Sequence, residues 1–245
     1  MTNKQQTPAK TSQQKSSVPE QASSSEEVSS FLDKVKSLAT TDTSGKRGRL
    51  IFAMDATMSR QPTWDMALGL QAGMFAAVKA VGGLDVQLVY FRGFGECLAS
   101  KWVADPEALA RLMTQVSCRG GMTQIGRVLS HARTECNSNK VNALIYVGDC
   151  MEENIDELSA IAGELGLLGM PVFLFQEGND LSAQTAFREL ARLTGGAYCR
   201  FDAGSAAQLR ELLSAVAIYA AGGRKALEKY SGGKGSATAL LEQLK

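Results

Sequence analysis

Five side chains that carry oxygen stand just beyond apolar runs of the sequence or in a glycine-rich turn. Two of them are carboxylates and three are hydroxyls, and none offers sulfur or imidazole. Such hard ligands suit Mg²⁺ or Mn²⁺ rather than zinc or copper. Together they nearly neutralise a divalent ion and leave a coordination position open for a carboxylate from outside. The candidate metal ligands are Asp55, Thr57, Ser59, Thr123 and Asp149.

The first three ligands alternate along the chain, at every second position. In a turn between a strand and a helix, alternate residues can point short side chains at one ion. A simpler interpretation is that Thr57 and Ser59 cap the helix that Pro62 opens, and that Asp149 caps the next helix. Capping and metal binding are compatible, so the two interpretations stand side by side.

Apolar runs alternate with helical segments from residue 50 onward, and this alternation predicts the elements that position the ligands. It implies right-handed crossovers and a mainly parallel sheet. The expected fold class is α/β, a doubly wound, Rossmann-like, three-layer sheet with helices on both faces and one short antiparallel edge strand. In such open sheets, ligands bind outside the carboxyl ends of the strands, near a topological switch point. The predicted strands are 50–54, 84–91, 96–102, 141–147, 171–175 and 195–201, and the predicted helices begin at Pro62, Asp105, Ile125, Glu152, Leu181 and Ala206.

Both ends of the chain differ in composition from residues 47–221, which we expect to form the domain. Residues 1–46 are rich in Ser, Gln, Thr and Lys, and are predicted to form a disordered tail because they bury too little apolar surface. Within this tail, residues 25–35 have the pattern of an amphipathic helix. We interpret it as a transient helix rather than a docking segment, because short isolated helices are marginal. Residues 222–245 are predicted to be a flexible C-terminal extension.

The ligand pattern resembles the von Willebrand factor A (VWA) family. Domains of that family carry a metal-ion-dependent adhesion site of the form Asp-x-Ser-x-Ser, followed by a distant Thr and a distant Asp. The resemblance covers about residues 48–220 and departs from the family at Thr57, where serine is more usual. It implies that the two aspartates act largely through water or by orienting ligands, and that the hydroxyls contact the ion directly or through water. The matching residues are Asp55, Thr57, Ser59, Thr123 and Asp149.

The resemblance implies a metal-dependent protein-binding module that acts as an intracellular adaptor, with a carboxylate of the partner completing the coordination of Mg²⁺ or Mn²⁺. The alternative is an accessory subunit of an AAA-type ATPase or of a chelatase-like complex. A metal-dependent phosphohydrolase is less favoured, because enzymes of the haloacid dehalogenase type need a second acid where Thr57 stands. No complete catalytic constellation is present, so we do not expect an enzyme. The residues expected on the partner-facing rim are Met58, Arg60 and Glu152.

Glu152 and Glu153 could add negative charge near the ion, but we favour their interpretation as acidic complements to the dipole of the helix that they open.

The composition of the whole chain limits the classes of partner that we expect. The formal net charge of +1 gives no field that would attract nucleic acid or anionic lipid. The sequence contains neither an apolar run of about 18 residues nor a secretory signal pattern. Five scattered cysteines indicate reduced thiols, so we expect a cytoplasmic protein with a protein partner, and neither nucleic acid nor membrane as a ligand.

Overall fold

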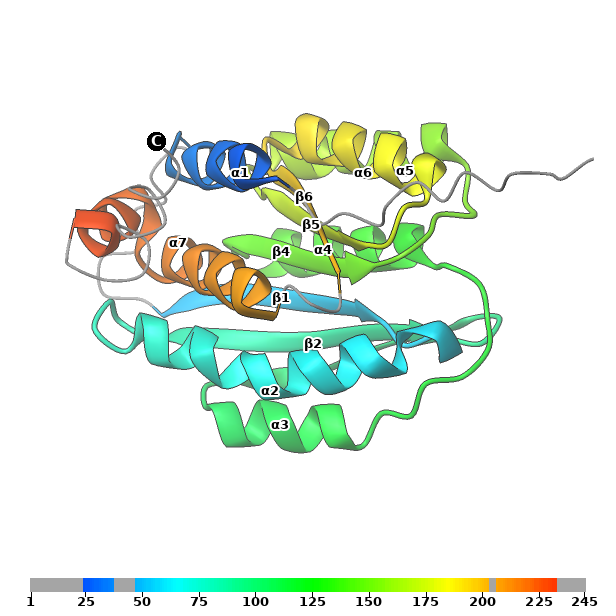
Figure 1. Ribbon diagram of the computed structural model, residues 1–245, viewed down its shortest axis with the longest axis horizontal. Coiled ribbons are helices and arrows are strands. Elements are labelled where there is room, and N and C mark those ends of the chain that lie inside the picture. Colours follow the sequence, from blue (N-terminus) through cyan, green and yellow to red (C-terminus); the bar gives the residue numbers. More distant parts are fainter. Residues whose placement is uncertain (1–23, 38–46, 203–205, 233–245) are drawn as a thin grey trace, which may run out of the picture.

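A six-stranded sheet forms the centre of the computed structural model, which describes residues 24–37, 47–202 and 206–232. The strand order is β3-β2-β1-β4-β5-β6 (Figure 1). All neighbouring strands are parallel except β3, which pairs antiparallel with β2 at one edge. The predicted α/β class and the antiparallel edge strand are therefore confirmed. The strands are β1 (Gly48–Asp55), β2 (Leu84–Arg92), β3 (Glu96–Val103), β4 (Ala143–Gly148), β5 (Val172–Glu177) and β6 (Ala197–Phe201).

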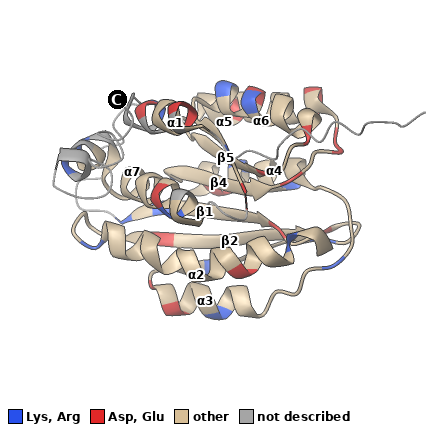
Figure 2. Cartoon of the chain, in the orientation of Figure 1, with Lys and Arg blue, Asp and Glu red and all other residues tan. Residues whose placement is uncertain are grey.

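Helices cover both faces of the sheet and complete three layers. One face packs against α1 (Ser25–Ser37), α2 (Gln61–Val78), α3 (Pro106–Thr114) and α7 (Ala206–Gly232). The other face packs against α4 (Ile125–Ser138), α5 (Ile155–Leu167) and α6 (Leu181–Thr194). Charged residues lie mostly on the helices and loops, and the middle of the sheet is largely uncharged (Figure 2). Among the described residues, no helix is long and apolar enough to cross a membrane.

Strand β1 lies in the middle of the sheet and is buried on both faces. Its side chains alternate, so that Leu50, Phe52 and Met54 enter one core and Ile51 and Ala53 enter the other. All five are at most 1% exposed. This burial explains the uninterrupted apolar run in the sequence, because a strand covered on both faces has no polar side.

Helix α5 begins later than the sequence predicted. The side chain of Asn154 caps it by accepting hydrogen bonds from the backbone amides of Asp156 and Glu157. The prediction that this helix opens at Glu152 is therefore wrong, because the side chain that satisfies its free amides lies two residues further on. Residues 149–154 instead form a loop at the end of β4.

Helix α1 packs against the sheet, which corrects the expectation of a transient helix within a disordered tail. Phe31 is 2% exposed, and its ring centroid lies 5.4 Å from that of Phe175 and 5.8 Å from that of Phe173. Val28 is buried beside it. The tertiary contact supplies the apolar burial that an isolated helix lacks. The remaining expected tail, residues 1–23 and 38–46, lies outside the described residues.

Helix α7 also continues past its predicted end at residue 220. It extends to Gly232 across a kink at Gly223, whose φ of 65° is left-handed. Leu227, beyond the kink, is 3% exposed and joins the core. The prediction of a flexible extension is therefore wrong for residues 222–232, because a buried apolar contact holds the second part of the helix. Residues 233–245 lie outside the described part of the chain.

We expect Phe31→Ala to lower the free energy of unfolding by about 3 kcal/mol, because it removes a large buried ring from between α1 and the sheet. Urea unfolding of the full chain measures the change. Ser30→Ala, at an exposed position of the same helix, is the matched control and should change the stability by less than about 0.5 kcal/mol. Equal stability of the two variants would show that α1 does not contribute to the folded core.

Candidate metal centre

The candidate centre lies between β1 and β4, where the order in which the chain adds strands to the sheet changes direction. The chain passes from β1 to β2 on one side, whereas β4 pairs with β1 on the other side and continues to β5. Because β1 and β4 are parallel, with Met54 opposite Val147, their carboxyl ends meet at one edge. Asp55 ends β1 and Asp149 follows β4 directly. The structure thus places both predicted carboxylates at the topological switch point.

Hydrogen bonds connect four of the five predicted ligands. Asp55 Oδ1 accepts a hydrogen bond from the backbone amide of Thr57 at 2.7 Å. Thr57 Oγ1 lies 3.4 Å from Ser59 Oγ, and Ser59 Oγ donates to Asp149 Oδ2 at 3.0 Å. The loop after β1 and the loop after β4 are therefore joined through the hydroxyl of Ser59.

Thr123 joins the same region through Glu152. Its hydroxyl accepts from the amide of Glu152 at 3.0 Å, and its own amide donates to Glu152 Oε2 at 2.9 Å. This reciprocal pair fixes the turn before α4 against the loop after β4. Glu152 thus has a structural role in addition to its predicted place on the rim.

The glycine-rich turn that carries Thr123 is held by the ends of two strands. Arg119 donates its amide to Ala56 O at 3.0 Å, and the amide of Met122 donates to Gly93 O at 3.2 Å. Gly121 is required there because a Cβ atom would lie 2.3 Å from Gly93 O. Backbone contacts with the ends of β1 and β2 therefore position the turn.

Glu153 interacts with a helix dipole, but with that of α4. Its carboxylate accepts from the amides of Ile125 at 2.5 Å and Gly126 at 2.9 Å, at the N-terminus of α4. The sequence-based interpretation assigned this charge to the helix that follows Glu153 in the chain. Only the spatial approach of the loop after β4 to the start of α4 shows which free amides the carboxylate satisfies.

Two buried carboxylate oxygens at the centre, Asp55 Oδ2 and Asp149 Oδ1, lack a hydrogen-bond partner among the described residues. A buried acceptor without a hydrogen bond lowers the stability of the folded state, and two such acceptors at one place are unusual. A hard divalent cation is a ligand that satisfies such oxygens. Together with the neighbouring hydroxyls, they form a donor set that fits Mg²⁺ or Mn²⁺.

The capping alternative for the hydroxyls has less support from the geometry. Thr57 precedes a short 3-10 turn, Met58–Arg60, and makes no side-chain capping hydrogen bond. Helix α2 likewise begins without a side-chain cap at Arg60. Asp149 is also too early to cap α5, which Asn154 caps. These oxygens are therefore not engaged at helix ends.

Burial changes the acidity of Asp55. The side chain is 1% exposed, and desolvation raises its pKa from 3.8 to about 6, against the opposing hydrogen bonds from Thr57. Asp149 raises this pKa further by repulsion, and Arg60 lowers it. Without a cation, Asp55 therefore stays mostly protonated up to about pH 6, well above the pH at which a solvent-exposed aspartic acid ionises.

Arg60 is buried rather than placed on the partner-facing rim, which corrects the prediction for this residue. Its side chain is 5% exposed and forms ion pairs with Glu177 and, at 3.5 Å, with Asp149. It also donates to Thr63 Oγ1 at 2.6 Å. The guanidinium group is held inside because Glu177, at the end of β5, supplies a partly buried partner charge.

Sequence reasoning missed Glu177 as part of this region. The signal for it was present, since Glu177 is a polar residue at the carboxyl end of a buried strand, as Asp55 is.

Of the predicted rim residues, Met58 is 63% exposed and Glu152 is also exposed. Because Arg60 is buried, the rim beside the centre carries less positive charge than the sequence predicted.

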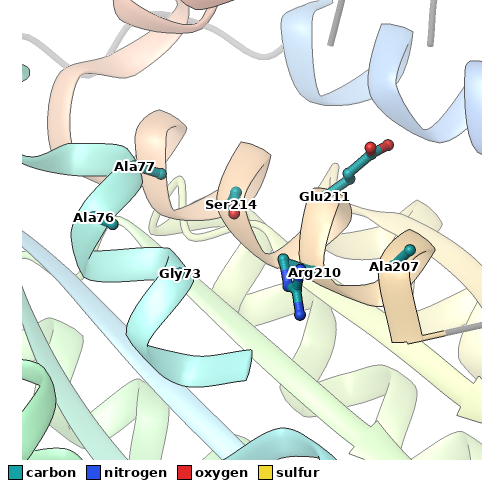
Figure 3. Close-up of a pocket in the computed structure, with 7 residues that line it drawn as sticks. All are labelled: Gly73, Ala76, Ala77, Ala207, Arg210, Glu211 and Ser214. Atoms are coloured by element: carbon teal, nitrogen blue, oxygen red, sulfur yellow. The ribbon is translucent and has the colours of Figure 1, made fainter. Parts of the chain in front are cut away.

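A groove between α2 and α7, with a volume of about 380 Å³, lies apart from this centre (Figure 3). Small side chains form most of its walls, and partial burial raises the pKa of Glu211. None of its lining residues is a predicted metal ligand. The residues that line it are Gly73, Ala76, Ala77, Ala207, Arg210, Glu211 and Ser214.

Comparison with known proteins identifies the fold as VWA-like. An aerotolerance-related membrane protein from Bacteroides fragilis is 18% identical, with a TM-score of 0.52 over 66% of this chain and 95% of that chain. The VWA domain of SpRpn10 is 11% identical, with a TM-score of 0.53 over 69% of this chain and 92% of that chain. No family model and no curated protein matches the sequence. The resemblance to VWA domains is thus confirmed at the level of the fold.

Another similar structure is described with a metal bound at its own metal-ion-dependent adhesion site (MIDAS). It is proximal thread matrix protein 1 from the mussel byssus, described as having a zinc-occupied MIDAS motif. The identity is 14% and the TM-score is 0.57, over 73% of this chain and 48% of that chain. This chain therefore spans about half the length of the mussel protein. At such identities the likeness concerns the fold.

We expect the metal-free wild type to lose about 2 kcal/mol more stability than Asp55→Asn as the pH rises from 4 to 7. The pKa of Asp55 is raised in the folded state, so its contribution is fully present below pH 3.8 and is lost as the pH rises through about 6. Urea unfolding in EDTA at several pH values measures the difference between the two proteins. Parallel pH profiles for the wild type and Asp55→Asn would contradict this assignment.

Proposed function

We propose that the chain is a protein-binding module that holds Mg²⁺ or Mn²⁺ at the carboxyl ends of β1 and β4. The observation that carries this proposal is a pair of buried oxygens, Asp55 Oδ2 and Asp149 Oδ1, that have no hydrogen-bond partner in the described segments and lie beside the hydroxyls of Thr57 and Ser59. Thr123 contributes the fifth oxygen from the turn that Glu152 holds in place. The mussel protein with a zinc-occupied motif of this kind supports divalent metal binding on this fold.

In this proposal the bound cation presents positive charge at the surface. Arg60 is buried and paired with Glu177, so it does not replace the cation in attracting a partner. A carboxylate of a partner protein completes the coordination, because hard divalent ions prefer oxygen ligands. In this proposal the residues of the chain bind and orient the ion, and the partner supplies the remaining ligand.

We expect wild-type protein to bind Mg²⁺ and Asp55→Ala to bind it more than about tenfold more weakly, because the change removes a carboxylate that no other group replaces. Titration calorimetry at pH 7.5 measures both. Asp85→Ala is the matched control, since Asp85 lies at the opposite end of β2 in an exposed pair with Arg47. Metal binding that is the same in all three proteins would remove Asp55 from the site.

We expect a partner protein to be retained on the immobilised chain with Mg²⁺ and released by EDTA. The same protein should bind Asp85→Ala and fail to bind Asp55→Ala, because only the second change removes the cation. Mass spectrometry of the retained material then distinguishes an intracellular adaptor from an accessory subunit of an AAA-type ATPase. Capture that is unaffected by both EDTA and Asp55→Ala would refute a metal-dependent contact.

A further inference from the structure

Large apolar side chains lie exposed around the candidate metal centre. Phe94 is 87% exposed, Met58 is 63% exposed and Met122 is 48% exposed. Met58 lies in the loop that carries two of the hydroxyl ligands, and Met122 directly precedes the third hydroxyl ligand. The amide of Met122 donates to Gly93 O at 3.2 Å, which places Met122 beside the turn that carries Phe94. Exposed groups of apolar side chains are a property of binding surfaces.

The turn that presents Phe94 is fixed rather than loose. Phe94 stands between Gly93 and Gly95, whose φ angles of 61° and 148° few other residues adopt. Gln124 Nε2 donates to Gly93 O at 3.3 Å, and Arg127 Nη1 donates to Gly95 O at 2.5 Å. The backbone on both sides of Phe94 is therefore bonded to the start of α4. An aromatic ring held outward in this way loses little conformational entropy when a partner covers it.

The charges beside this ring favour an acidic partner. The side chain of Arg119 is 61% exposed, and its ion-pair partner, Glu96 Oε2, lies 3.9 Å away. The other oxygen of Glu96 is already held by Arg92 at 2.6 Å. One carboxylate thus faces two guanidinium groups, which leaves positive charge at the surface. Glu152, the exposed acid of the predicted rim, accepts a hydrogen bond from the amide of Thr123.

We propose that Phe94 and Met122 form an apolar anchor for a protein segment that carries an acidic residue close to a large apolar residue. The acidic residue completes the metal coordination, and the apolar residue covers Phe94 and Met122. Arg119 attracts a further acidic group of the same segment. This inference rests on the proposed function, because it takes the metal-bound carboxylate as its starting point. Aromatic, methionine and arginine side chains are the types enriched in protein interfaces.

Selection from a phage-displayed library of short random peptides on the immobilised full chain in Mg²⁺ tests the anchor. We expect the enriched peptides to contain an Asp or Glu with a Phe, Leu, Ile or Trp nearby, and to be released by EDTA. Fluorescence anisotropy of the strongest synthetic peptide then compares the wild type with two variants. Phe94→Ser should weaken binding about tenfold. Leu167→Ser should have no effect, since Leu167 is 91% exposed and lies at the end of α5 opposite to the loop that carries Asp149 and Glu152.

Phe94 is exposed, so its substitution leaves the folded core intact, and calorimetry with Mg²⁺ alone should give equal metal binding for Phe94→Ser and the wild type. Absence of Mg²⁺ binding by the wild type would overturn the proposed function itself. Normal Mg²⁺ binding, together with unchanged peptide binding by Phe94→Ser, would overturn only the anchor. The anchor is also overturned if no metal-dependent peptide is enriched, or if the enriched peptides carry acids without an apolar neighbour.

A membrane surface is the other occupant that an exposed Phe beside arginines can bind. Vesicles of phosphatidylcholine and phosphatidylserine, sedimented with the protein in EDTA, distinguish it. We expect no binding to these vesicles. Binding that persists in EDTA and is lost in Phe94→Ser would assign the surface to lipid and overturn the proposal of a protein segment.

Discussion

The parallel pairing of β1 with β4 is the constraint on which the candidate centre depends. It brings two carboxylates from distant parts of the chain to one edge of the sheet, where the surrounding core desolvates Asp55 and raises its pKa to about 6. The strands that hold these carboxylates are buried on both faces, so the backbone cannot easily move to separate them. Asp55 Oδ2 and Asp149 Oδ1 are therefore kept buried without a hydrogen-bond partner from the part of the chain that the structure describes, which lowers the stability unless a cation satisfies them.

Hydrogen bonds and ion pairs connect the loops around this pair of carboxylates to one another. Ser59 joins the first loop to Asp149, Glu152 joins the second loop to Thr123, and Glu153 satisfies the free amides of α4. Arg60 and Glu177 extend the same network to the end of β5. Such mutual bonding preorganises the oxygens, because each ligand is oriented by a neighbour before an ion arrives.

The surface above the centre has a different physical character from the centre itself. The centre itself consists of hard oxygen ligands and buried charges. The exposed apolar side chains around it are those of Met58, Phe94 and Met122. A partner that combines a carboxylate with a neighbouring apolar group matches both parts. The groove between α2 and α7 is lined by a single carboxylate, that of Glu211, and by no aromatic ring, so it does not share this combination. The VWA-like fold thus supplies the scaffold, and the loops of this chain supply the side chains of the proposed site.

The sequence by itself determined the α/β class, the order of most elements and the candidate ligands, because buried strands leave uninterrupted apolar runs and short polar residues stand out at their ends. It did not determine which groups those polar residues would meet. Arg60 is buried because Glu177 approaches from another strand, and Glu153 satisfies α4 rather than the helix that follows it. Helix α1 likewise forms part of the core only because Phe31 finds Phe173 and Phe175 on the sheet. These outcomes rest on contacts between segments far apart in the chain, which local composition and periodicity do not record, and only the tertiary structure decided them.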